Sequence, residues 1–166
     1  MAGERLILTG FMGVGKSAVS RDLASLLGVS RYDTDDWMET ESGLDVPTLV
    51  KTDMPRFRRL EADTLLHLLG LEPAAISTGG GIVSTEVGRG VLLGAGVPVI
   101  WLQAPFETSV ERVAYDTGRE RPLFNDIDSA RALHAERQPW YAETCHFAVD
   151  ATQPAKLIAT DIISHL

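Results

Sequence analysis

The segment Gly10-Phe11-Met12-Gly13-Val14-Gly15-Lys16-Ser17 has the residue types that hold a phosphate chain. It fits the pattern G-x-x-x-x-G-K-[ST], in which glycines let successive backbone N–H groups turn toward a phosphate. The lysine can reach the outer phosphates and the serine hydroxyl can ligate Mg²⁺. An apolar run precedes the motif and a helical pattern follows it, which disfavours a chance glycine turn. The expected nucleotide-binding residues are Gly13, Val14, Gly15, Lys16, Ser17 and Ala18.

A pair of carboxylates, Asp33 and Asp35, follows the second apolar run. Asp33 can position Mg²⁺ through water, and Asp35 can orient an acceptor hydroxyl or accept its proton. Aspartate is also a preferred N-cap, and a helix is expected from Thr34. The sequence alone leaves open whether one of the pair is only a helix cap.

Arginines and glycines supply the other candidate groups. Arg58 stands three residues before Glu61 on an expected helix, so the carboxylate can hold the guanidinium, whose planar fork suits a carboxylate ligand. The alternative is an exposed charged face. Gly79, Gly80 and Gly81 follow the third apolar run and allow a ligand to approach backbone N–H groups, although they also fit a tight turn.

Two later arginines are also candidates. Arg121 lies in an expected exposed segment, from which an arginine can stabilise a transferring phosphoryl group; the alternative is an ordinary basic loop. Arg137 comes near the end of an expected helix that Pro139 should stop. At that position it can also do no more than favour the helix C-terminus.

The elements that must position these groups alternate along the chain. Apolar runs predict strands at 6–9, 29–32, 74–77, 97–102 and 146–149. Helical periodicity predicts helices at 17–27, 34–41, 55–69, 85–93, 106–115, 128–138 and 154–166, with Leu26 and Leu166 among the inward residues. This α/β pattern predicts a parallel sheet covered on both faces. Ligands then bind beyond the carboxyl ends of the strands, where the candidate groups lie.

Composition limits the alternatives. A chain of 166 residues fits one domain, 1–166, and its net charge of −8 argues against nucleic-acid and anionic-membrane partners. The single cysteine, Cys145, cannot form an internal disulfide, which fits a reducing cytoplasm. No apolar run approaches the length of a membrane span. We expect a cytoplasmic monomer.

Taken together, these motifs resemble the shikimate kinase family over nearly the whole chain. The likeness rests on their order and spacing: residues 10–17, Asp33-Thr34-Asp35, Phe57-Arg58-Arg59-Leu60-Glu61, the glycines 79–81, Arg121-Pro122-Leu123, and Arg137 followed by Pro139 and Tyr141. The resemblance implies a P-loop kinase fold: three α/β/α layers, a five-stranded parallel sheet of order 2-3-1-4-5, a substrate-binding region near 34–61 and a mobile lid near 116–126.

The resemblance also implies an activity, transfer of the γ-phosphoryl of ATP to the 3-hydroxyl of shikimate on the route to chorismate and the aromatic amino acids. Lys16 and Arg121 would contact phosphates, and Ser17 with Asp33 would serve Mg²⁺. Asp35 would bind the shikimate hydroxyls and act as base. Arg58 and Arg137 would hold the shikimate carboxylate, and Gly79, Gly80 and Gly81 would line the pocket.

The chain departs from the family pattern around 49–56, where the stretch before Phe57 is one residue shorter and Leu49 or Val50 replaces a common pocket phenylalanine. The segment between Arg121 and Arg137 is also shorter. Two other functions therefore stay open: a P-loop kinase for another hydroxylated acid, such as gluconate or a cyclitol, and a nucleotide-binding protein without catalysis.

Overall fold

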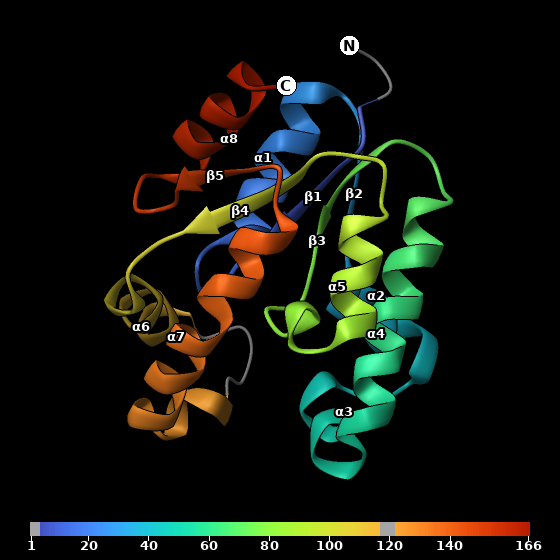
Figure 1. The fold of residues 1–166 in the computed structure, drawn as a ribbon. Helices are drawn as coiled ribbons and strands as arrows, with labels where there is room; N and C mark the ends of the chain where they lie inside the picture. Colours follow the sequence, from blue (N-terminus) through green and yellow to red (C-terminus); the bar gives the residue numbers. More distant parts are fainter. Residues whose placement is uncertain (1–3, 117–121) are drawn as a thin grey trace.

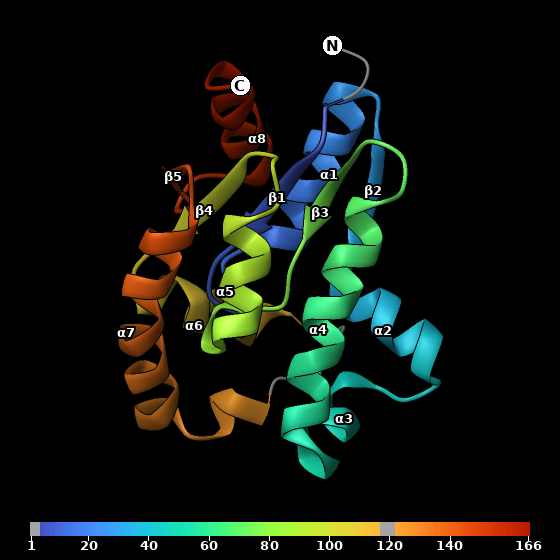
Figure 2. The same ribbon diagram turned by 45° about the vertical axis from the view of Figure 1, so that its right-hand side comes forward.

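The computed structural model describes residues 4–116 and 122–166. They form a parallel five-stranded sheet with helices on both faces (Figures 1 and 2). The elements follow the chain in the order β1 (Leu6–Thr9), α1 (Lys16–Leu27), β2 (Ser30–Asp33), α2 (Thr34–Ser42), α3 (Val46–Thr52), α4 (Met54–Leu69), β3 (Ala74–Ser77), the 3₁₀ turn η1 (Ile82–Ser84), α5 (Glu86–Leu93), β4 (Val99–Gln103), α6 (Phe106–Tyr115), the 3₁₀ turn η2 (Pro122–Asn125), α7 (Ile127–Thr144), β5 (Phe147–Asp150) and α8 (Ala155–Ser164).

The strand order is β2-β3-β1-β4-β5, as the resemblance implied. Strand β1 lies at the centre and is hydrogen-bonded to β3 and β4, with Leu8 opposite Ser77 and Ile100. On the outer side of β3, Asp33 at the end of β2 stands opposite the same Ser77. The carboxyl ends of three neighbouring strands therefore meet. The segments that follow them carry the P-loop (residues 10–17), Asp35 in the first turn of α2, and the glycine loop (residues 79–81).

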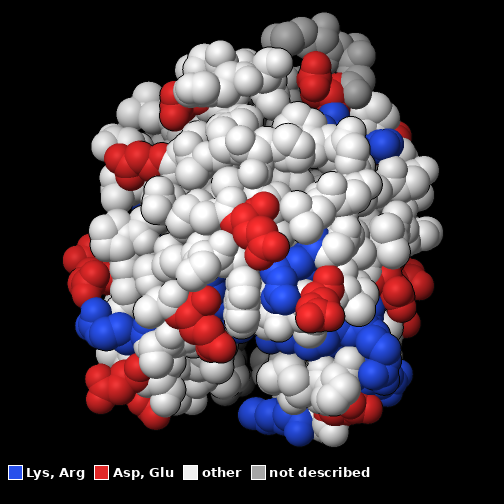
Figure 3. Space-filling model, in the orientation of Figure 1, with Lys and Arg blue, Asp and Glu red and all other residues white. Residues whose placement is uncertain are grey.

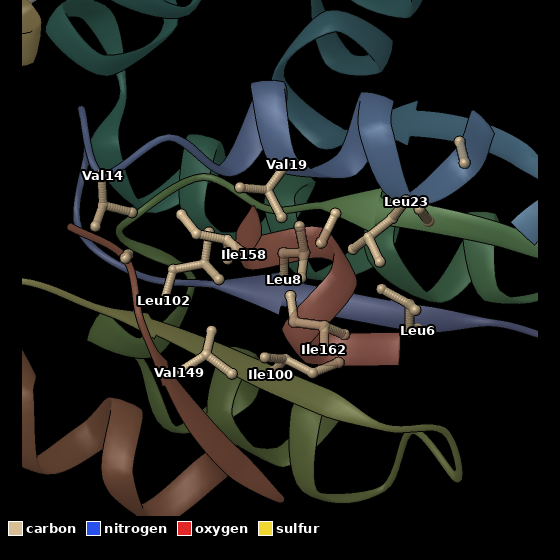
Figure 4. Close-up of a cluster of buried hydrophobic side chains, with 14 of the residues drawn as sticks. Leu6, Leu8, Val14, Val19, Leu23, Ile100, Leu102, Val149, Ile158 and Ile162 are labelled. Carbon is tan, nitrogen blue, oxygen red and sulfur yellow. The ribbon is translucent and has the colours of Figure 1, made fainter. Parts of the chain in front are cut away.

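A hydrophobic core lies on each face of the sheet, because helices cover both faces of its strands. One core joins the sheet to α1 and α8 through Val19, Leu23, Ile158 and Ile162, around Leu8 and its neighbours (Figure 4). The other joins the opposite face to α4, α5 and α7. A small third core of Met38, Leu49 and Phe57 fixes α2, α3 and α4 to one another.

The structure corrects three predictions, two about inward residues and one about a helix end, and it adds one helix. Leu26 and Leu166, expected inside, are 49% and 42% exposed. Leu26 lies off the buried face of α1, and Leu166 lies beyond Ser164, the last residue of α8. Helix α7 does not stop before Pro139 but continues to Thr144. Helix α3, which the sequence analysis did not predict, follows the N-cap Asp45, whose carboxylate accepts from the Thr48 N–H at 2.7 Å.

No helix within the two described ranges is long and apolar enough to cross a bilayer.

Candidate active site

A cavity of about 900 Å³ lies beyond the carboxyl ends of the central strands. It collects side chains from elements far apart in sequence, and Figure 3 shows the surface hollowed between the α7 side and the α3–α4 side. The predicted site residues that line it are Gly13, Gly15, Lys16, Ser17, Ala18, Asp33, Asp35, Arg58, Gly79, Gly80, Gly81 and Arg137. Val14 is not among them, and Arg121 lies outside the described residues.

The P-loop ends at a helix start that is left open for an anion. Gly15 is the N-cap of α1, with a φ of 106° that an L side chain rarely adopts, and no side chain caps the helix. The first N–H groups of α1 and the positive end of its dipole therefore face the cavity, which is an arrangement suited to phosphate. Gly13 also has a positive φ, and a Cβ there would stand 2.6 Å from a methyl of Val113, so α6 packs tightly against the loop.

Lys16 and Val14 hold the P-loop in shape. The buried Lys16 ammonium donates to the carbonyl oxygens of Gly10 at 2.6 Å and Phe11 at 3.0 Å. Val14 buries its side chain in the α1–α8 core and its N–H donates to Phe11 at 3.2 Å. Val14 therefore shapes the loop in this structure, whereas its neighbours line the cavity.

Asp33 combines a capping role with a contact to the P-loop. Its Oδ1 accepts from the N–H groups of Asp35 at 3.0 Å and Asp36 at 3.4 Å, which makes it the N-cap of α2. Its Oδ2 accepts from the hydroxyls of Ser17 at 2.9 Å and Ser77 at 2.6 Å. The question left by the sequence is thus answered: Asp33 is the helix cap, and it still lies against Ser17.

The Ser17 hydroxyl and the Asp33 carboxylate fit a Mg²⁺ site. Mg²⁺ prefers oxygen ligands and is commonly held by one or two protein oxygens, with phosphates and waters completing the octahedron. These two groups lie side by side at the cavity edge next to the open start of α1. Their chemistry and position match that requirement.

Asp35 and Glu61 converge on the glycine loop from two different helices. A Cβ at Gly79 would stand 2.6 Å from Oε1 of Glu61 and 3.0 Å from Oδ1 of Asp35. Asp35 lies in the first turn of α2, one residue after Thr34, whose hydroxyl accepts from the Gly79 N–H at 3.1 Å. Only glycine leaves both carboxylates room at this position.

Arg58 and Glu61 form a partly buried ion pair on α4. The guanidinium donates to Oε2 of Glu61 at 2.5 Å, and only 2% of the Glu61 side chain is exposed. Burial raises the pKa of Glu61, and the neighbouring charges of Arg58 and Arg137 offset part of this effect. A Cβ at Gly81 would overlap the Arg58 guanidinium, so Arg58 lies directly over the glycine loop. The reading of Arg58 as part of an exposed charged face is wrong.

Arg137 reaches the same place from the opposite wall. It is 3% exposed, and its Nε and one terminal nitrogen have no hydrogen-bond partner among the described residues. Burial lowers the pKa of the guanidinium, which nevertheless stays protonated at neutral pH. A buried cation with unpaired donors that lines a cavity is suited to an anionic ligand, because an unsatisfied buried donor is costly.

Several lining residues were not expected from the sequence. Val46, Pro47 and Lys51 of α3 form one wall, together with Val50, and Arg112 of α6 lies near the P-loop with its guanidinium donating to the Val14 carbonyl. The α3 wall had a local signal: Asp45 followed by proline in the first turn is a typical helix start. Arg112 had no such signal, since nothing in the sequence around it indicates a contact with the P-loop.

Comparisons with known proteins agree with this geometry. The shikimate kinase family model matches residues 12–166. The chain is 36% identical to a shikimate kinase of Halorhodospira halophila, over 98% of this chain and 93% of that protein. It is 34% identical to a shikimate kinase of Neisseria gonorrhoeae, over 94% and 92% of the two chains.

Solved structures give the same result. A shikimate kinase from Acinetobacter baumannii, in complex with shikimate, superposes with a TM-score of 0.89 at 29% identity, over 98% of this chain and 92% of that chain. A gluconokinase from Sinorhizobium meliloti, with a TM-score of 0.64 at 20% identity over 98% and 90% of the two chains, shares the fold. Family model, sequence relatives and structural neighbours agree, so this chain belongs to the shikimate kinase family.

Proposed function

We propose that this chain transfers the γ-phosphoryl group of ATP to the 3-hydroxyl of shikimate. The observation that carries the proposal is that one cavity joins an open helix N-terminus, suited to phosphate, to a carboxylate-binding pair of arginines. Asp35 lies in the same cavity. A donor anion, an acceptor carboxylate and a carboxylate base therefore have places in a single cavity.

On the donor side, Lys16 and the N–H groups around Gly13 and Gly15 would hold the phosphates, with Ala18 at the cavity edge. Ser17 and Asp33 would hold Mg²⁺, which supplies positive charge that neutralises the phosphate oxygens when bound. Arg121 would contact the transferring phosphoryl group. These assignments are supported by the P-loop geometry and, for Arg121, by its sequence position alone.

On the acceptor side, Arg58 and Arg137 would bind the shikimate carboxylate from two walls. Asp35 would orient the hydroxyl groups and take the proton of the attacking one. Gly79, Gly80 and Gly81 would form the floor. This arrangement separates the ends of the acceptor: the carboxylate lies against the arginines, and the reacting hydroxyl against Asp35 and the P-loop.

The proposal extends to the organisation of the chain. Residues 1–166 would act as a single domain, with an acceptor-binding region near 34–61 and a lid near 116–126. The enzyme would work as a monomer in the cytoplasm on ATP and shikimate, without nucleic-acid or membrane partners. Among the residues near 34–61, Val46, Val50 and Phe57 line the cavity and support the first of these assignments.

The test is ADP release in a coupled assay with shikimate, quinate and gluconate as acceptors. We expect turnover that depends on shikimate and on Mg²⁺. Equal ADP release with gluconate, or none with shikimate, would contradict the proposal. ATP binding without turnover on any of these acids would instead favour a non-catalytic nucleotide-binding role.

A further inference from the structure

We propose that Tyr141 is a positioning residue for the acceptor site: its hydroxyl holds the peptide between Gly80 and Gly81, so that the glycine loop presents its N–H groups to the acceptor. This inference rests on the proposed function, since it assigns a role within the same site. Tyr141 does not line the cavity, so it would act through the loop rather than touch the substrate.

The contact is short and well supported. The Tyr141 hydroxyl donates to the Gly80 carbonyl at 2.5 Å across 61 residues of sequence. The side chain is fully buried, and its ring stacks on Trp101 of β4 with centroids 5.9 Å apart and planes at 26°. Burial raises the pKa of the phenol, so it stays protonated and remains a donor. Burial of the side chain and the stacking on Trp101 thus fix where the hydroxyl points.

Peptide geometry links this hydrogen bond to the acceptor. In a planar trans peptide, the Gly80 carbonyl and the Gly81 N–H point in opposite directions. With the carbonyl held by Tyr141, the Gly81 N–H points away from Tyr141. In the described part of the chain, neither the Gly80 nor the Gly81 N–H donates to a protein acceptor, and both residues line the cavity. Two donors are therefore available to an anionic or hydroxylated ligand.

The loop is confined between Tyr141 and the P-loop. A Cβ at Gly80 would stand 3.0 Å from the Met12 nitrogen and 3.2 Å from the Gly10 oxygen, so the two loops meet backbone to backbone. Tyr141 also follows Arg137 by four residues on α7, shares its face and interacts with its side chain, so the glycine signals are the readout that separates an effect through the loop from one through Arg137. One turn of this helix would then fix both the carboxylate-binding guanidinium and the loop opposite it.

Tyr141→Phe tests the proposal, because it removes the hydroxyl and keeps the ring and its stacking. We expect the shikimate KM to rise about ten-fold, which corresponds to one hydrogen bond of ordinary strength. The ATP KM should change less than two-fold. In ¹⁵N NMR spectra without substrate, the amide signals of Gly80 and Gly81 should shift and exchange faster with solvent. Tyr32→Phe is the matched control: it removes the hydroxyl of a tyrosine on β2 that donates to Glu72, and it should change none of these readouts.

The outcomes separate three cases. A higher shikimate KM together with altered Gly80 and Gly81 signals supports the proposal. If either readout stays at the wild-type value, or if the ATP and shikimate KM rise equally, Tyr141 is only a packed core residue and the proposal is wrong. Wild-type protein that fails to turn over shikimate would contradict the proposed function instead. The NMR comparison still tests Tyr141 in that case. If the Gly80 and Gly81 signals of Tyr141→Phe match those of wild type, Tyr141 does not order the loop. If they differ, it does.

Discussion

At the scale of single residues, two aspartates two positions apart have different roles because only one of them ends a strand. Asp33 closes β2 and accepts from two N–H groups and two hydroxyls, contacts that fix it against α2, Ser17 and Ser77 and away from the acceptor side of the cavity. Asp35, in the first turn of α2, lines the cavity beside Gly79. The residue suited to proton transfer is therefore the second of the pair.

Replacing Asp35 by asparagine should preserve the fold and nucleotide binding, because the amide is nearly isosteric. Turnover should fall by roughly 10²- to 10⁴-fold, the range typical of a positioned acid or base. The measurement is steady-state kcat with ATP and shikimate, with nucleotide binding checked by titration. Asp63→Asn, an exposed position on α4, serves as control. Phosphoryl transfer by Asp35→Asn within a few-fold of wild type would remove Asp35 from the mechanism.

Arg137 offers a sharper test of the acceptor site than truncation does. Arg137→Lys keeps the positive charge near Glu61, so folding should survive, but an ammonium cannot reproduce the planar guanidinium fork. We expect the shikimate KM to rise about 10- to 100-fold, from the loss of a charged hydrogen bond, with the ATP KM nearly unchanged.

Arg131→Lys makes the same change on the same helix, at a side chain that is 54% exposed and pairs with Glu107. It should leave both KM values near wild type. If Arg137→Lys behaved like Arg131→Lys, or raised only the ATP KM, the carboxylate of the acceptor would not be bound at Arg137.

The sequence predicted the chemistry of these residues better than their surroundings. One cavity collects the P-loop pattern, Asp35, Arg58, the glycines and Arg137. Each of these groups stands at a strand end or on a helix, and periodicity can locate both kinds of element. The sequence raised the possibility of an aspartate cap before Thr34, but it could not show that the capping Asp33 also contacts Ser17, since that contact depends on how β2 packs beside α1. Nor could the sequence show that the Tyr141 hydroxyl contacts the Gly80 carbonyl, because the two residues are 61 positions apart and only the folded chain brings them together.

At the scale of elements, α7 shows tertiary packing overriding a local rule. Pro139 lacks an N–H and disfavours a helical residue before it, so the sequence predicts that the helix ends near 138. The helix nevertheless runs to Thr144, because Ala130, Arg137 and Tyr141 on one face are all buried. Pro139 itself is exposed, so its ring meets solvent rather than the core.

This reading predicts that Pro139→Ala stabilises the protein. The alanine restores the N–H that the Ala135 carbonyl lacks and removes the strain of proline inside a helix, worth up to about 3 kcal/mol. Without proline the unfolded chain has more conformational freedom, which lowers this gain in stability by roughly 0.4–1 kcal/mol. The free energy of unfolding from urea titration should therefore rise by about 1–2.5 kcal/mol. A decrease would show that the proline conformation is needed to keep α7 packed.

Helix α3 shows the opposite limit of sequence analysis. Its seven residues contain too little periodicity to be recognised, although Asp45 and Pro47 mark its start. Its stability comes from tertiary contact, since Leu49 packs between Met38 of α2 and Phe57 of α4 in the small third core. One wall of the cavity is therefore built by an element that only the folded chain defines.

At the scale of the whole molecule, the charge distribution opposes the net charge. The chain carries −8 overall, yet residues 46–60 contain Lys51, Arg56, Arg58 and Arg59 against the single acidic residue Asp53. In Figure 3, Lys and Arg side chains gather over α3 and α4 beside the hollow. An anionic acceptor is thus repelled by most of the surface and attracted to the face where the cavity opens.

Exposed charges at this face should speed capture of the acceptor without taking part in the chemistry. Arg56 and Arg59 are exposed and do not line the main cavity. The double variant Arg56→Gln/Arg59→Gln should therefore lower kcat/KM for shikimate by roughly two- to five-fold at low salt and leave kcat unchanged. The loss should shrink as salt rises above about 0.1 M, where charges more than about 10 Å apart are screened.

Lys156→Gln, an exposed charge on α8, removes one positive charge elsewhere and should have little effect at any salt concentration. Two results would contradict the argument: a loss in the double variant that persists unchanged at high salt, or an equal effect per charge from Lys156→Gln, because the first points to direct contact and the second to net charge alone.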